Sequence, residues 1–184
     1  MADTSIIKKA AVAILTTAIV VISIGFLLPE HLSIPVRGST PADWNHNSFW
    51  FKPWGKSGVH RGIDIFAGEG REVVSSCPGI VLCASTSGNG GNFVAILGPK
   101  WRIHYYAHLK EISARTGRLV SQNEKIGSVG TTGNAAGKPP HLHYAIISQI
   151  PYPWLYRSER FGVDHMFYLN PHQLLMEGAR KSHL

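Results

Sequence analysis

Two short segments of the chain contain histidine and aspartate residues at a spacing that could bind a metal ion. His60 and Asp64 lie four residues apart with Gly62 between them, and one residue separates His141 from His143. On a β-strand, residues i, i+2 and i+4 point to one face. We therefore expect each pair to share a strand face. If the two strands are neighbours, imidazole and carboxylate groups converge on one point.

A carboxylate buried among imidazoles needs a compensating cation. Nitrogen and oxygen donors without thiolates suit zinc, and three protein ligands leave a fourth position open for water, as in catalytic sites. Each pattern alone is weak, since a His-x-His pair is more often incidental. His108 strengthens the interpretation because it ends another alternating segment, in which we expect it to share a face with His104 and Tyr106. Histidines that are not ligands could act as acid or base beside zinc-bound water.

Short β-strands are the elements that must position these residues. Apolar or alternating segments of four to eight residues, separated by glycine- and proline-containing turns, cover 59–66, 73–76, 80–83, 93–97, 101–108, 125–129 and 142–147. Pro78-Gly79 predicts a hairpin between the second and third of these segments. A helix of more than a turn or two is expected in this region only near Pro171–Glu177. The pattern favours an all-β antiparallel fold, either a sandwich or barrel-like.

The N-terminal segment has the features of a membrane anchor. Lys8 and Lys9 precede an uncharged run from Ala10 to Leu28, which as a helix spans ~29 Å. The positive flank predicts a cytoplasmic N-terminus. We expect a single-pass helix in the inner (cytoplasmic) membrane with the rest of the chain periplasmic. A cleaved signal peptide, which also exports the remainder, and a buried core helix are the alternatives.

The predicted organisation is a cytoplasmic N-terminus (1–9), a transmembrane signal anchor (10–28), a proline- and glycine-containing linker (29–43) and one domain (44–184, core 54–150). The aromatic cluster at 44–54 is either a cap on the sheet or a wall of a substrate groove. Charged residues make up 16% of the chain and hydrophobic residues 44%, which excludes a disordered protein. The net charge of +7 suits an anionic wall polymer or lipid head groups, or ordinary solubility. Nucleic acid is not an expected partner outside the cytoplasm.

Four segments resemble, in order, the motifs of the lysostaphin/LytM-type zinc endopeptidases. The His-x-Gly-x-Asp-x-x-Ala signature is matched at His60–Ala67, and Tyr-x-His-Leu is matched at Tyr106–Leu109. The closing Gly-rich segment is matched at Gly127–Asn134, and His-Leu-His is matched within Pro140–Tyr144. The resemblance covers about residues 54–147, and Tyr168–Pro171 resembles the segment that ends many such domains.

The resemblance implies one zinc ion bound by His60, Asp64 and His143, with His108 and His141 as the catalytic pair. It also implies a compact antiparallel β domain, described as a duplicated hybrid motif, with the site in a groove on the sheet. The implied substrate is peptidoglycan, whose peptide cross-links would be hydrolysed.

Two further residues are expected to contact the substrate. Tyr106 belongs to the second motif. Lys138 lies in a loop, 135–139, that is longer by about two residues than its counterpart in the family.

In the implied mechanism, a water molecule activated by zinc attacks the amide carbon, with a histidine as general acid or base. Two other functions stay open. The chain could be a non-hydrolytic module of this fold that binds peptidoglycan or activates a wall amidase, or a peptidase acting on another envelope substrate. The complete set of five site residues favours the enzyme. The sequence indicates no protein partner.

Overall fold

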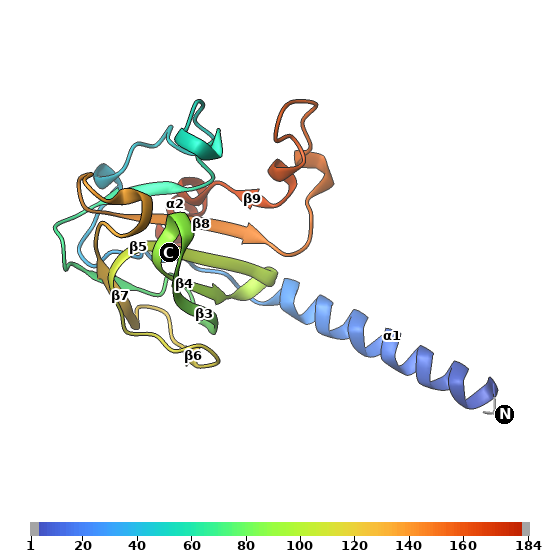
Figure 1. Cartoon of the computed structure of the whole chain (residues 1–184). Helices are drawn as coiled ribbons and strands as arrows, with labels where there is room; N and C mark the ends of the chain where they lie inside the picture. The colour runs from blue at the N-terminus through green and yellow to red at the C-terminus, as the bar shows by residue number, and fades with distance from the viewer. Residues whose placement is uncertain (1–3, 182–184) are drawn as a thin grey trace.

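A long helix and an antiparallel sheet domain make up the protein in this computed structural model, which describes residues 4–181. The outer ends of the predicted cytoplasmic segment (1–3) and of the predicted domain (182–184) lie outside the described residues. Helix α1 (Thr4–Leu27) projects from the domain, and helix α2 (Pro171–Lys181) ends it (Figure 1). The expected C-terminal helix is therefore confirmed and is longer than predicted.

In the part of the chain that the structure describes, nine strands form one antiparallel sheet, which confirms the predicted fold class. The main path runs in the order β1-β8-β5-β4-β3-β6, while β7 pairs with β2 and β5, and β9 pairs with β8. The strands are β1 (Ile63–Phe66), β2 (Glu72–Val74), β3 (Gly79–Ser87), β4 (Gly91–Leu97), β5 (Arg102–Ile112), β6 (Leu119–Val120), β7 (Lys125–Val129), β8 (His141–Ser148) and β9 (Tyr168–Leu169).

The hairpin predicted at Pro78-Gly79 is wrong. Strand β2 pairs with β7, and β3 pairs with β4 and β6. Val73 and Val74 of β2 are buried, and on its other side Val36 forms an isolated bridge with Val73. Both partners of β2 are remote in sequence, so local turn residues did not reveal the pairing.

The segment expected to be a linker, 29–43, packs onto the domain instead of spanning open space. Leu32 and Val36 are buried in the core. Ser33 N donates to Ser76 O at 3.0 Å, and Val74 N donates to Pro35 O at 2.9 Å. Alternating apolar residues let this segment add to the sheet next to β2, which buries side chains that a free linker would leave in water.

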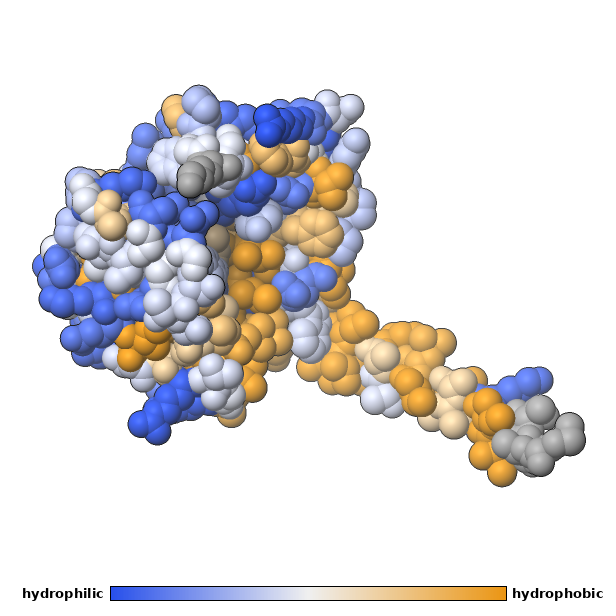
Figure 2. Space-filling model, viewed as in Figure 1, coloured by the Kyte–Doolittle hydropathy of each residue, from blue (hydrophilic) through white to orange (hydrophobic). Residues whose placement is uncertain are grey.

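Helix α1 has no charged residue after Lys9 and is mostly exposed. It is the one helix among residues 4–181 that is long and apolar enough to cross a membrane, over Ser5–Leu27, and a signal sequence near an N-terminus has the same features. Figure 2 shows it as a largely hydrophobic rod that leaves a mixed, mostly polar domain surface.

Strands β1 and β8 separate the core from the site. Ile63 and Ile65 of β1 and Leu142 and Tyr144 of β8 are fully buried. The residues between them in sequence point to the opposite face of the sheet, as the alternation predicted. This face carries the functional side chains.

Candidate metal centre

The structure places the two predicted pairs next to each other, although His60 lies before β1 and not on the strand. Strands β1 and β8 are antiparallel neighbours, with Asp64 opposite His143 and Phe66 opposite His141. Strand β5 lies on the other side of β8, with Ala107 opposite His143. The site is therefore built on three adjacent strands at the β1 end of the sheet.

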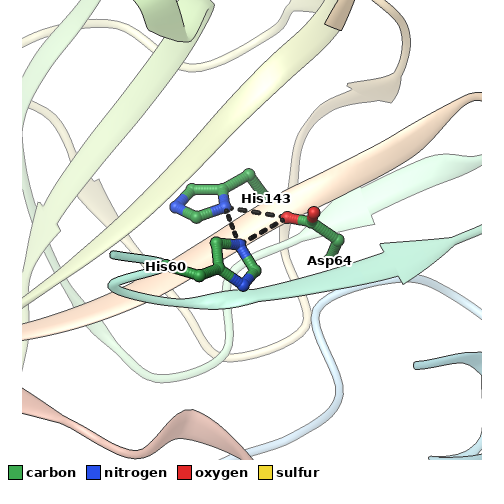
Figure 3. A group of neighbouring side chains, drawn as sticks. All are labelled: His60, Asp64 and His143. Carbon is green, nitrogen blue, oxygen red and sulfur yellow. Dashed lines mark hydrogen bonds and ion pairs between the residues drawn. The ribbon is translucent and has the colours of Figure 1, made fainter. Parts of the chain in front are cut away.

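Three side chains converge at this point, as Figure 3 shows. His143 Nδ1 lies 2.8 Å from Asp64 Oδ1, and His60 Nε2 lies 3.1 Å from the same oxygen. The two imidazole nitrogens are 3.1 Å apart. One donor atom from each residue thus faces a common centre, where a single metal ion could be bound.

The segment before β1 fixes the orientation of His60. Its Nδ1 donates to Ser48 O at 2.9 Å, which leaves Nε2 with a lone pair toward the site. Trp54 stacks on the ring, with centroids 4.1 Å apart. The backbone of Trp50 donates to His60 O at 2.7 Å, and His60 N donates to Phe51 O. The aromatic cluster therefore positions a site residue, and Trp54 also lines the cavity.

The charge state of the three residues fits a cation. Burial raises the pKa of Asp64, but hydrogen bonds and electrostatic attraction from His143 and His60 lower it more, so its pKa lies well below the usual value. The carboxylate is therefore ionised and lies beside the imidazole nitrogens of His60 and His143. Two nitrogens and one carboxylate oxygen match the donors of a catalytic zinc site.

Two further histidines lie beside this centre. His108 Nδ1 donates to Thr132 O at 2.9 Å, and His141 Nδ1 donates to Pro139 O at 2.8 Å, so in the neutral form of each ring the lone pair is on Nε2. Their ring centroids are 5.1 Å apart. Burial lowers the pKa of His108 to about 4, with a further contribution from the other histidines of the site. His108 is neutral at pH 7 and can accept a proton.

A backbone irregularity brings His108 to the site, contrary to the expected shared face. His104 and Tyr106 are fully buried on the core side of β5, whereas His108 lines the cavity. The pairing of β4 with β5 shifts register between Val94 opposite Tyr106 and Asn92 opposite Leu109. His108 itself has a φ of 64°. This bulge reverses the side-chain alternation at one residue.

The expected substrate contact of Tyr106 is incorrect for the same reason. Tyr106 is fully buried, and its hydroxyl accepts a hydrogen bond from Ser76 N at 2.9 Å. Its neighbour Tyr105 lines the cavity instead. Only the position of the bulge distinguishes the two tyrosines, and the alternation around them gave no sign of it.

The centre opens into a cavity of about 760 Å³. One wall comes from the segment around Trp54 and Arg61, and the other from the loops that contain Asn89 and Lys138. Lys138 lines the cavity, and its contact with a substrate stays a prediction. Arg61, Tyr105 and Asn89 are lining residues to which the sequence assigned no role, whereas Trp54 belongs to the aromatic cluster for which a groove wall was one of two expectations.

Comparisons with known proteins identify relatives of this chain. The model of peptidase family M23 matches residues 58–151. The L-Ala–D-Glu endopeptidase of Bacillus subtilis is 36% identical over 152 residues, which are 73% of this chain and 45% of that protein. The peptidoglycan DD-endopeptidase ShyC of Vibrio cholerae is 33% identical over 114 residues, which are 59% of this chain and 26% of that protein. The match thus spans less than half the length of either relative.

A solved structure shows the same fold. The catalytic domain of lysostaphin from Staphylococcus simulans superposes with a TM-score of 0.59 over 74% of this chain and 95% of that domain, at 23% identity.

Proposed function

The chain belongs to peptidase family M23, and on that premise we propose that it is a membrane-anchored zinc endopeptidase that hydrolyses peptide cross-links of peptidoglycan. The observation that carries the proposal is the convergence of His60, Asp64 and His143 beside two further histidines, on one wall of a cavity. The names of the two relatives refer to different bonds, so the bond that this chain cleaves is a question for experiment.

We propose His60 Nε2, Asp64 Oδ1 and His143 Nδ1 as the ligands of one zinc ion. Zinc bound there supplies a Lewis acid that acidifies a water molecule and polarises the scissile carbonyl. Ser48 O holds the tautomer of His60, and the stacked ring of Trp54 limits its rotation. These two contacts keep the ligands aligned before the substrate arrives.

His108 and His141 would move the proton during hydrolysis. One neutral Nε2 accepts the proton of the attacking water as the new carbon–oxygen bond forms. The other ring would carry on its Nε2 a proton taken from solvent before the substrate binds, and would donate a hydrogen bond from it to the oxygen that becomes negatively charged. The accepted proton then passes to the leaving amine as the carbon–nitrogen bond breaks. Thr132 O and Pro139 O fix both rings throughout.

We further propose that α1 is retained as a single-pass anchor, with Lys8 and Lys9 cytoplasmic and the domain periplasmic. In support, Trp101 Nε1 donates to Ile22 O at 3.0 Å, and its indole occupies the space where Gly25 lacks a side chain. Cleavage would remove this partner. We place the start of the domain at Glu30, because the segment after the helix packs into the core.

The test is digestion of purified sacculi by the full chain in detergent, with mass spectrometry of the released fragments. We expect release that a chelator stops and zinc restores, and the fragment masses identify the bond. The Asp64→Asn variant should lose both zinc and release, whereas His141→Ala should keep zinc and lose release. His31→Ala, a histidine outside the site, is the matched control and should behave as the parent protein.

The variants also separate the alternatives. A folded, zinc-loaded protein that releases nothing from sacculi would refute the wall peptidase and leave a different envelope substrate or a non-hydrolytic module. A protein that binds no zinc and releases nothing would favour the binding module. Normal turnover by His141→Ala would show that the catalytic roles are misassigned.

A further inference from the structure

We propose that the edge of the domain next to α1 rests on the bilayer surface, with the turn Pro99–Trp101 and the loop 150–157 among the lipid head groups. The inference rests on the proposed membrane anchor and goes beyond it, because an anchor alone does not place the domain. Four observations carry it.

The first observation is that the segment connecting the anchor to the domain is very short. Helix α1 ends at Leu27, and Glu30 already forms an ion pair with Arg102 of β5. The Glu30 side chain is only 4% exposed, and Leu32 is part of the core. The three residue steps from Leu27 to Glu30 can extend over at most ~11 Å, so the domain must stay beside the membrane.

The second observation concerns the depth of the turn Pro99–Trp101. Trp101 contacts α1 at Ile22 and Gly25, inside the apolar span that ends at Leu27. With a rise of ~1.5 Å per residue, Gly25 lies only ~3 Å along the axis from Leu27. The indole is therefore at the level where the helix leaves the hydrocarbon, and tryptophan is enriched at this level of membrane proteins.

The third observation is a line of contacts from this turn to an exposed aromatic loop. Gln149 N donates to Trp101 O at 2.9 Å. Arg102 Nη2 donates to the hydroxyl of Tyr152 at 3.1 Å, and the Tyr152 ring meets Trp154 edge-on at 5.2 Å between centroids. In Figure 1 the connection between β8 and β9, which includes this loop, lies on the side of the sheet from which α1 leaves.

The fourth observation is the surface chemistry of the loop. Trp154 is 76% exposed and Tyr156 55% exposed. Each combines an apolar ring with a polar group, as side chains in the interfacial region of a bilayer do. Lys100 and Arg157 add positive charge to the same two segments, and neither is in an ion pair within residues 4–181. These cations complement anionic lipid head groups.

Tryptophan fluorescence tests the proposal because α1 contains no tryptophan. The five tryptophans, at 44, 50, 54, 101 and 154, all lie in the domain. The full chain is reconstituted into vesicles of phosphatidylcholine and phosphatidylglycerol with and without bromine on the acyl chains. Bromine quenches only those tryptophans that lie close to the lipid. We expect partial quenching in the parent protein and loss of part of the quenched emission in Trp154→Phe.

Trp54→Phe is the matched control for this measurement, because Trp54 lies at the cavity and should contribute nothing to the quenched emission. Circular dichroism checks that each variant is folded. We expect Trp154→Phe to fold normally, because the Trp154 side chain is exposed. Vesicles of phosphatidylcholine alone should quench Trp154 less, since they remove the charge attraction.

Quenching that is the same in Trp154→Phe and in the parent protein would overturn the proposal. Protection of Trp154 from acrylamide without quenching by bromine would also overturn it and indicate a protein partner on the loop. Failure of the protein to float with the vesicles would refute the anchor, and with it this inference. Digestion of sacculi is measured separately, so the peptidase proposal can survive that result.

Discussion

Replacement of Gly62 by alanine tests whether close packing of two strands holds the candidate metal centre together. A Cβ atom at Gly62 would lie 2.5 Å from Tyr144 O and 2.8 Å from His143 Cε1. One neighbour is backbone and the other is the ring of a proposed ligand. The added methyl group must therefore separate β1 from β8 or turn the His143 ring away from Asp64.

The required displacement is large compared with the tolerance of a metal site. Ordinary contacts of this kind begin at 3.4 Å, so the gap to Tyr144 O must widen by about 0.9 Å. Metal–ligand distances in proteins vary by only ~0.2 Å. We expect the loss of zinc affinity to be about 10–100-fold, as for disturbed supporting residues of metal sites. Overpacking should also lower the free energy of unfolding by about 1–3 kcal/mol.

Zinc affinity is measured by competition with a chromogenic chelator, turnover by release from sacculi, and stability by thermal unfolding followed by circular dichroism. Gly68→Ala is the matched control. No atom lies within 4 Å of the Cβ position at Gly68, and its φ is outside the left-handed region. This variant should keep zinc affinity and turnover, with stability unchanged or higher by about 0.4–1 kcal/mol.

Gly62→Ala with the zinc affinity, turnover and Tm of the parent protein would refute the reasoning. It would mean either that the strands adapt without cost or that His143 is not a ligand. Normal zinc affinity with a lowered Tm would refute only the assignment of His143 as a ligand. The close packing at Gly62 would then be confirmed by the lower stability.

Three further predictions concern the support of the site and the metal. Tyr144→Phe removes the hydroxyl that lies 2.7 Å from His104 Nδ1. It should lower the free energy of unfolding by about 1–3 kcal/mol, because the buried imidazole of His104 loses its hydrogen-bond partner. Zinc affinity should be unchanged. Arg102→Met leaves the buried Glu30 carboxylate with only the longer contact to His104 Nε2, at 3.7 Å. It should cost about 3–5 kcal/mol in urea unfolding, most of which Glu30→Gln in the same chain should restore. Chelation of the parent protein should lower its Tm, and zinc but not magnesium should restore it, since the three donors include two imidazoles.

Each of these predictions has a result that contradicts it. Unchanged stability in Tyr144→Phe would show that the bond to His104 contributes nothing. If the double variant were no more stable than Arg102→Met, Glu30 and Arg102 would not be coupled. A Tm that does not respond to chelator would contradict the metal centre itself.

The sequence alone predicted the parts of the site that depend on local periodicity. His141 and His143 share a face of β8 because side chains alternate along any strand, and Asp64 of β1 faces the same centre. His60 was expected on the same strand as Asp64 but reaches the centre from the segment before β1. The apolar helix at the N-terminus and the all-β class followed from composition and turn residues. The two pairs could converge only if their strands were neighbours. The pairing of β1 with β8 shows that these strands are neighbours.

Features that arise from remote pairing were decided only by the tertiary structure. The bulge at His108 depends on the register between β4 and β5, which no local pattern contains. For this reason His108 reaches the cavity while Tyr106, expected to contact the substrate, is buried. The segment expected to be a linker is in the core because β2 offers an edge to Val36. Periodicity along one strand determines which residues share a face, but the partner strand determines what that face contacts.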